Sequence, residues 1–214
     1  MNITNIEVFN FKGALRGMRN PLNSHSKSDT NYGFIYHGAP LLGPNDYDLA
    51  MRLINAGPEH RKFLRQIFVS MDITAPFYWW KEFDTYKIGT TANSGSTMHT
   101  LHKESISPDM FETPIRGDKE FLSYLDYLEK LRKEYVETKN VDAWKQLVQC
   151  LPSSWLQTRT WTGNYEILRN ICTQRAHHKL TEWHYFCDTI KEQVPYAKDF
   201  IFIPEGEEEN EKTN

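Results

Sequence analysis

Residues 151–190 read LPSSWLQTRTWTGNYEILRNICTQRAHHKLTEWHYFCDTI, and this stretch is the most informative part of the chain. Pro152 cannot continue a helix, so it ends a helix expected over residues 142–151 and separates it from a Thr-rich aromatic run. Two further helices are expected over residues 167–174 and 180–192, because apolar residues recur there at helical spacing. Arg175 closes the first of them, where its charge either suits the negative end of the helix dipole or serves a bound anion.

The chain before residue 151 alternates further helical patterns with few strand signals. Residues 119–139 carry apolar side chains at helical spacing with charged residues between them, which predicts a long amphipathic helix. Asn45 is expected to cap a helix that ends before Gly57. Residues 67–74 favour a strand, and Pro76 then begins a helix expected to end near Gly89. These patterns predict an α+β fold with a small central sheet flanked by helices and a mostly helical C-terminal half.

The two ends of the chain differ in composition from the rest. Residues 1–44 contain RGMRNPLNSHSKSDTNYG, which lacks helical or strand periodicity and predicts an irregular N-terminal arm. Residues 205–214 are acidic and predict a disordered tail. The length predicts a single domain over residues 1–204. The arm's cations either grip a phosphate or lie on a solvated loop, and they are Arg16, Arg19, His25 and Lys27.

The composition excludes several classes of protein. With 39% hydrophobic and 25% charged residues the chain suits a globular fold. A formal net charge of −3 provides no basic field for nucleic acid. No run approaches the ~18 apolar residues of a membrane span, and the N-terminus lacks a signal-peptide pattern. Three cysteines without a CxxC pair favour a reducing compartment. We therefore expect a cytoplasmic protein that binds neither nucleic acid nor membrane.

Cationic residues lie beside segments of small polar residues. EHRKFLRQ, residues 59–66, brings His60, Lys62 and Arg65 together, and these donors either hold a diphosphate or form a solvated charged face. TTANSGSTMH, residues 90–99, has no large apolar side chain before Met98 and offers hydroxyl and amide hydrogen bonds to a ligand.

The histidines do not predict a metal site. The clusters, which are His99 with His102 and His177, His178 with His184, have no acidic ligand at a recognisable spacing. The common phosphate-loop, dinucleotide, hydrolase and metalloprotease motifs are absent from the sequence.

The stretch from residue 151 resembles the C-terminal region of the flavin-dependent thymidylate synthases (ThyX). The features that carry the resemblance are Leu151-Pro152, the run 158–162, Asn164, Arg175, His178 and Glu182-Trp183. Upstream, the layout of Gly57 and His60, a strand, Ala75-Pro76 and a helix leading to Lys87 is also similar. The resemblance spans residues 45–200, and the stretches WWKEFDTYK and SHSKSDT resemble uncharacterised relatives from Firmicutes and their phages.

The resemblance implies a ThyX-like fold and the reductive methylation of dUMP to dTMP. Methylenetetrahydrofolate would give the carbon, reduced FAD the hydride, and NADPH would be a co-substrate. The resemblance implies a homotetramer with sites between subunits, which suits a chain with 14% aromatic residues because interfaces are rich in Tyr and Trp.

The resemblance also assigns roles to individual residues. Arg175 would be catalytic, polarising the uracil ring and stabilising negative charge as it develops. The other nucleotide-binding residues would be Glu82, Thr85, Ser94, Gly95, Ser96 and Thr97. The cofactor-binding residues would be His60, Lys62, Arg65, Tyr86, Lys87, Ile88, Asn93, Asn164 and His178. Three aromatic side chains either stack on a base or flavin or pack in the core, and they are Trp79, Trp80 and Tyr86.

The sequence departs from the family at the flavin-binding signature. The signature's Arg-His-Arg is Thr85-Tyr86-Lys87 here, and its final Arg is Met98. Lys87 keeps a charge but lacks the planar fork of an arginine. Three functions remain open: a ThyX-like enzyme, a non-catalytic nucleotide-binding protein that has lost flavin use, and a flavoenzyme acting on another pyrimidine nucleotide.

Overall fold

In the computed structural model the chain divides into two compact units, and the structure describes residues 1–112 and 118–202. Unit 1 comprises residues 1–2, 73–85 and 92–160, and unit 2 comprises residues 3–72, 86–91 and 161 onward. The expected single domain over residues 1–204 stays a prediction, and the expected acidic tail at 205–214 lies outside the described residues.

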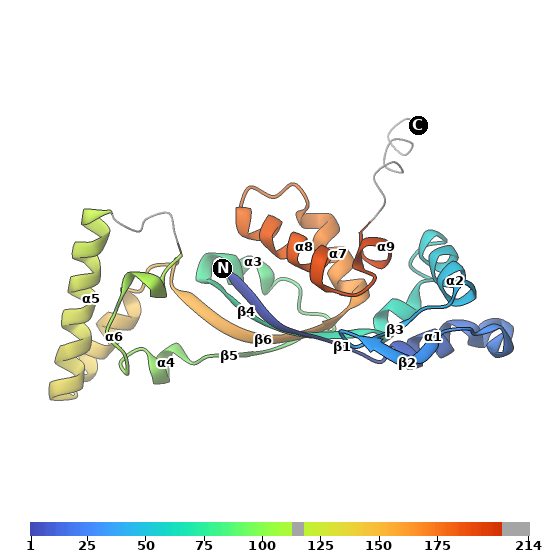
Figure 1. Ribbon diagram of the computed structural model, residues 1–214. Coiled ribbons are helices and arrows are strands. Elements are labelled where there is room, and N and C mark those ends of the chain that lie inside the picture. Colours follow the sequence, from blue (N-terminus) through green and yellow to red (C-terminus); the bar gives the residue numbers. More distant parts are fainter. Residues whose placement is uncertain (113–117, 203–214) are drawn as a thin grey trace. The chain divides into compact units, whose positions relative to one another are not determined.

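The elements form an α+β fold in which helices flank a small sheet, as expected (Figure 1). The strands are β1 (Asn2–Phe9), β2 (Asn31–Tyr36), β3 (Ala39–Leu41), β4 (Phe68–Pro76), β5 (Thr91–Ser94) and β6 (Leu156–Asn164). The helices are α1 (Phe11–Arg19), α2 (Pro44–Asn55), α3 (Phe77–Phe83), α4 (Thr97–Thr100), α5 (Lys119–Thr138), α6 (Val141–Gln149), α7 (Tyr165–Arg175), α8 (Thr181–Gln193) and α9 (Ala197–Phe200). Short 3₁₀ turns lie at Asn20–Leu22, His25–Lys27, Lys62–Gln66 and Pro108–Met110.

The main sheet has the strand order β1-β4-β6-β5, and β2 pairs separately with β3. Two side-chain contacts show that β4 and β6 run antiparallel: Thr74 Oγ1 lies 2.7 Å from Thr158 Oγ1, and Thr162 Oγ1 lies 3.3 Å from Ser70 Oγ. Thr158, Thr160 and Thr162 occupy alternate positions of β6, where β-branched residues suit a pleated surface.

In unit 2 the helices α7, α8 and α9 lie close together (Figure 1), and aromatic side chains form much of the core there. Trp183, Phe186 and Phe200 are fully buried. Tyr165 meets Phe11 edge to face at 5.7 Å, and its hydroxyl donates to the carbonyl of Pro195 at 2.6 Å. Burial raises the pKa of Tyr165 well above its usual value, so this phenol stays a hydrogen-bond donor.

Unit 1 contains a leucine core between α5 and α6 and an aromatic cluster on α3. The buried leucines are Leu101, Leu125, Leu128, Leu131 and Leu147. On α3, Trp79 stacks on Phe83 at 4.7 Å, and Trp79 and Trp80 are almost entirely buried. The core alternative is therefore confirmed for these two tryptophans, and the interpretation that they stack on a base or flavin is wrong.

Several element boundaries differ from those expected. The helices at residues 119–139 and 142–151 are confirmed as α5 and α6, and the strand at 67–74 is confirmed as β4. However, residue 43, a glycine with extended backbone, caps α2 in place of Asn45. The helix α3 ends at Phe83, well before Gly89, and Asp84 is its C-cap residue.

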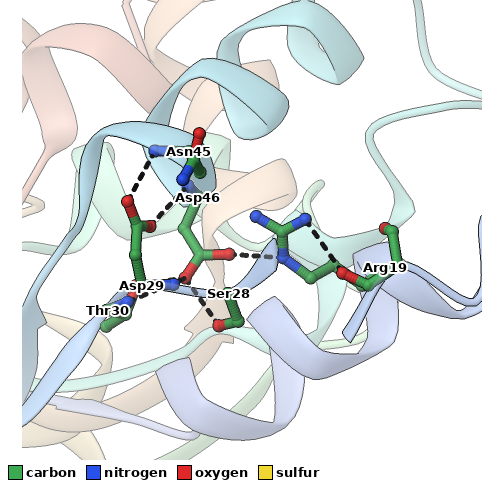
Figure 2. A network of polar contacts seen from close by, with 7 residues as sticks. Arg19, Ser28, Asp29, Thr30, Asn45 and Asp46 are labelled. Carbon is green, nitrogen blue, oxygen red and sulfur yellow. Dashed lines mark hydrogen bonds and ion pairs between the residues drawn. The ribbon is translucent and has the colours of Figure 1, made fainter. Parts of the chain in front are cut away.

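The expected irregular arm of residues 1–44 is wrong, since it contains β1, α1, β2 and β3. A buried carboxylate orders its central loop (Figure 2). Asp46, at the start of α2, accepts hydrogen bonds from Arg19 Nε at 2.6 Å, Ser28 Oγ at 2.8 Å and Thr30 Oγ1 at 2.5 Å. Asp29 in turn accepts from the backbone N–H of Asn45 and Asp46 in the first turn of α2. Arg19 is 3% exposed, so this cation holds the arm and does not grip a phosphate.

We expect Asp46→Asn to lower the free energy of unfolding by about 3–5 kcal/mol, because it leaves the Arg19 guanidinium buried without a counter-charge. Urea denaturation at pH 7 measures this loss, with the exposed Asp48→Asn on the same helix as the control. Equal stability of the two variants would contradict the role given to Asp46.

The same carboxylate predicts a pH dependence of stability. Burial alone raises the pKa of Asp46, but hydrogen bonds from Thr30, Ser28 and Arg19 outweigh it and hold the pKa below its usual value. The stabilisation is then complete above the unfolded-state pKa, about 4, and is lost as the pH falls through the lower folded-state pKa. Asp46→Asn should remove this part of the acid-side decline.

Candidate functional site

The sequence-predicted site residues fall into two sets, one in each unit. Unit 1 contains the nucleotide set other than Arg175, together with one cofactor residue: Glu82, Thr85, Asn93, Ser94, Gly95, Ser96 and Thr97. Unit 2 contains the rest: His60, Lys62, Arg65, Tyr86, Lys87, Ile88, Asn164, Arg175 and His178.

In unit 2, Arg175 lies in an aromatic setting at the C-terminal end of α7. Its guanidinium carbon is 4.7 Å from the ring centroid of Trp183 and 5.5 Å from that of Tyr86. Arg175 Nε donates to the Tyr86 hydroxyl at 2.9 Å, and that hydroxyl donates to Gln174 Oε1 at 3.0 Å. Cation–π contact with two rings and a hydrogen bond at Nε fix the plane of the guanidinium. The structure thus brings Arg175 and Tyr86 into direct contact.

His178 belongs to the same cluster. It lies in the turn between α7 and α8, with its ring 6.1 Å from that of Trp183. Its Nδ1 accepts from the backbone N–H of Leu180 at 3.1 Å, which fixes the ring and assigns a neutral imidazole's proton to Nε2. His178 therefore helps to shape the turn that presents Trp183 to Arg175.

The loop 86–91 lies against the start of α7. Asn164 Oδ1 accepts from the backbone N–H of Ile167 at 3.0 Å, so this side chain caps α7. A Cβ on Gly89 would lie 3.2 Å from Ile167 Cδ1, which shows how closely the loop approaches the helix. Lys87 and Ile88 extend outward, and Ile88 is 92% exposed.

The basic segment 59–66 is ordered as a turn whose predicted cations face solvent. His60, Lys62 and Arg65 are exposed, and within residues 1–112 and 118–202 their side chains make no hydrogen bond or ion pair. Arg61, which the sequence analysis did not select, forms a two-pronged ion pair with Glu166 at 2.9–3.1 Å. Glu166 lies in the first turn of α7, where the helix dipole favours an acid.

In unit 1, the predicted nucleotide residues lie on α3 and on the turn between β5 and α4. The backbone N–H of Gly95 donates to the carbonyl of Thr158 at 2.9 Å, and Gln157 Nε2 donates to the carbonyl of Gly95 at 2.9 Å. Thr85 Oγ1 donates to the carbonyl of Glu82 at 2.7 Å, so Thr85 caps the end of α3. The backbone at Gly95 is thus held on both sides by β6.

Arg159 on β6 is a second residue that the sequence analysis missed. Its guanidinium lies over the ring of Trp80 at 4.1 Å, donates from Nε to Gln157 Oε1 at 2.9 Å and from Nη1 to Asp84 Oδ1 at 2.7 Å. The alternation of Thr158, Thr160 and Thr162 with Gln157, Arg159 and Trp161 is the signal that could have placed it on a strand.

Unit 2 contains a larger hollow without a predicted site residue and a smaller one that is lined by Arg175. The larger, about 780 Å³, lies between the β2–β3 hairpin and the α8–α9 turn, and no predicted site residue lines it. The smaller, about 460 Å³, is lined by two cations and an acid, Arg175, Lys191 and Asp188, with His177, His184, Cys172 and Cys187 beside them. We give the smaller hollow more weight because it contains Arg175 and its volume suits a small ligand.

The two cysteines of this hollow are joined by a hydrogen bond between their side chains. The hydrogen bond from Cys172 to Cys187, together with burial, raises the pKa of the Cys172 thiol well above its usual value. The same hydrogen bond lowers the pKa of Cys187, although burial opposes the shift.

The described part of the chain contains no group of three or more His, Cys, Asp or Glu side chains placed to hold a metal ion. None of its helices is both long and apolar enough to cross a membrane.

The fold is that of the flavin-dependent thymidylate synthases. The chain is similar to ThyX from Helicobacter pylori in two crystal structures, both with FAD and dUMP, at a TM-score of 0.72 and 19% sequence identity in each case. The match covers 94% of this chain in both, and 98% and 97% of the other chains. No family model matches the sequence, and no curated protein matches it either. The resemblance seen in the sequence is therefore confirmed at the level of fold.

Tyr86→Phe should lower the free energy of unfolding by about 1 kcal/mol, because it removes the hydroxyl that accepts from Arg175 and donates to Gln174. For a chain of this size the melting temperature should fall by about 2–4 °C. The control is Tyr185→Phe on α8, whose half-exposed ring should tolerate the change. An equal effect in both variants would sink the claim that this hydroxyl orders the cluster.

Proposed function

We propose that the protein is a thymidylate synthase-like enzyme that converts dUMP to dTMP by reductive methylation. Methylenetetrahydrofolate is the carbon donor, and NADPH is the reductant that regenerates the reduced flavin. The observation that carries the proposal is Arg175, fixed by Trp183 and Tyr86 at the end of α7 in a fold shared with structures that contain FAD and dUMP.

Arg175 binds the pyrimidine ring in this proposal. Its guanidinium is already held in one plane by aromatic faces, so its N–H donors need no reorganisation when negative charge develops on a carbonyl oxygen of the ring. Partial burial strengthens this interaction, because less water screens the charge.

In unit 1, small polar residues suit the phosphate of a nucleotide. Ser94, Ser96 and Thr97 offer hydroxyl groups, and Gly95 places its backbone between them without a side chain. The hydrogen bonds from β6 to Gly95 hold this turn in one conformation, which reduces the ordering entropy that binding would otherwise cost.

The residues of unit 2 fit the charge of FAD. Lys62, Arg65 and Lys87 are exposed and, in the described part of the chain, make no side-chain hydrogen bond or ion pair, so they can meet a diphosphate. The oxygen of Asn164 is used to cap α7, which leaves its amide group as the donor toward a flavin. FAD, when bound, supplies the hydride for the reaction.

A second candidate, a nucleotide-binding protein without flavin chemistry, is favoured by Glu166. Its carboxylate occupies the first turn of α7, a helix start that otherwise attracts phosphate, and it pairs with Arg61, so this arginine adds no net positive charge for an anionic cofactor. Thr85 and Tyr86, in place of Arg and His, add no charge to offset it.

The homotetramer and the cytoplasmic location stay predictions. Exposed apolar side chains on the β2–β3 hairpin support self-association, since Phe34, Ile35 and Tyr36 are 55–65% exposed. Sedimentation equilibrium of the purified protein measures the assembly.

The proposed function predicts that the purified protein takes up FAD and turns over dUMP. Isothermal titration with FAD, dUMP and other pyrimidine nucleotides measures binding, and release of tritium from [5-³H]dUMP with methylenetetrahydrofolate and NADPH measures the reaction. Binding of dUMP without FAD uptake or tritium release would replace the proposal by the second candidate. FAD uptake with preference for another pyrimidine nucleotide would point to the third function left open by the sequence.

Arg175→Ala should weaken dUMP binding at least tenfold, about 1.4 kcal/mol, because the ring loses its charged donor. Arg175→Lys should recover only part of this loss, since an ammonium group lacks the planar fork. The control is Lys179→Ala, which removes an exposed cation from the following turn. Unchanged dUMP affinity in Arg175→Ala would exclude Arg175 from the nucleotide site.

A further inference from the structure

We propose that Arg159 is the residue that binds the 5′-phosphate of the nucleotide, and that Asp84 holds its place until the phosphate arrives. This inference rests on the proposed function, because it names the residue that meets the phosphate of the proposed nucleotide. It concerns a residue that the family signature does not include.

The geometry of Arg159 prepares it for an anion. Trp80 lies under its guanidinium at 4.1 Å, and Gln157 holds Nε, so the position and plane of the group are fixed from two sides. Only Nη1 is taken up by Asp84, at 2.7 Å. Since the side chain makes no other hydrogen bond to the described residues, Nη2 remains available for a phosphate oxygen.

Arg159 supplies a positive charge, which the predicted nucleotide residues of unit 1 lack. The set Glu82, Thr85 and Ser94–Thr97 contains no cation, although a phosphate monoester carries a charge of about −1.5 to −2 at pH 7. The same Gln157 amide links the two groups, because Oε1 accepts from Arg159 and Nε2 donates to the carbonyl of Gly95. One glutamine side chain therefore joins the guanidinium to the hydroxyl-bearing turn.

The burial of the ion pair indicates that Asp84 can be exchanged. The Arg159 side chain is 16% exposed, whereas that of Asp84 is 51% exposed. A half-exposed ion pair of this kind contributes little to stability, so a dianion bound to the same guanidinium can replace the carboxylate at little cost. Asp84 then acts as a competitor of the phosphate, and its removal should favour the ligand.

This exchange predicts effects of opposite sign for the two partners. Arg159→Gln should weaken dUMP binding at least tenfold, and Asp84→Asn should strengthen it about threefold or more. Neither variant should change the affinity for deoxyuridine, which lacks the phosphate. Titration calorimetry with dUMP and deoxyuridine measures all of these affinities. The control is Lys81→Gln, which removes an exposed charge from α3 and should leave the ratio of the two affinities unchanged.

The other outcomes separate a failure of this inference from a failure of the proposed function. If both variants weaken dUMP binding, the ion pair only supports the fold of the site, and the inference is overturned. Suppose that the wild type binds dUMP much more tightly than deoxyuridine. If the ratio of the two affinities is the same in Arg159→Gln, the inference fails while the proposed function stands. If the wild type binds neither compound, both fail. Circular dichroism and melting curves show whether Arg159→Gln folds. If Arg159→Gln does not fold, Arg159→Lys replaces it in the test, and this variant should retain part of the phosphate preference because it keeps the charge.

Discussion

The hydrogen bond between Asn164 and the backbone of Ile167 sets the direction in which α7 leaves β6, and most of unit 2 depends on it. A strand can pass directly into a helix only if the exposed N–H groups of the first turn find acceptors, and a cap of this kind contributes about 1 kcal/mol. The next residue, Tyr165, donates its backbone N–H to Ile67 and its hydroxyl to Pro195, which attaches the same junction to the start of β4 and to the turn before α9. Arg175 lies at the far end of the helix so placed, and its position follows from this junction.

Three arginine–carboxylate pairs have different roles because their burial differs. The Arg19–Asp46 pair is almost completely buried, so breaking it leaves a charge away from water and costs several kcal/mol. Arg61 and Glu166 are partly buried and joined by two parallel hydrogen bonds, an arrangement that favours one fixed geometry. The Arg159–Asp84 pair is asymmetric, with one partner fixed and the other half exposed. Of these three pairs, the last combines a fixed cation with a half-exposed counter-ion, which suits the exchange that we propose for it.

The helices with strong periodicity could be predicted from the sequence, whereas the strands of polar composition could not. The helix α5 forms where its apolar spacing predicts it, because the regularly spaced Leu125, Leu128 and Leu131 are buried on one face. By contrast, β6 carries Gln, Thr and Arg at positions that a buried strand would fill with apolar residues, and its pairing with β4 and β5 comes from distant parts of the chain. The arm at residues 1–44 shows the same limit, since its order depends on Asp46, which no local pattern connects to Ser28 or Thr30.

The candidate site could be predicted where a residue acts through its own identity and position in a motif. Arg175 is of this kind: the structure places it against Tyr86 and Trp183, and the role implied by the resemblance stays a prediction. Arg61 and Arg159 could not be found in this way, because their settings depend on partners 105 and 75 residues away in the chain.

The distribution of arginine and lysine limits where specificity can arise. Among the predicted cofactor residues of unit 2, Lys62 and Lys87 are exposed. Each ammonium group is a point charge on a flexible stem, so it attracts an anion without selecting the shape of that anion. The guanidinium groups of Arg159 and Arg175 are instead held against aromatic rings, at 4.1 Å and 4.7 Å, so their hydrogen-bond directions are set before a ligand arrives. Discrimination between related nucleotides requires donors of fixed direction, so the proposed function assigns this discrimination to arginines held in this way and not to the lysines.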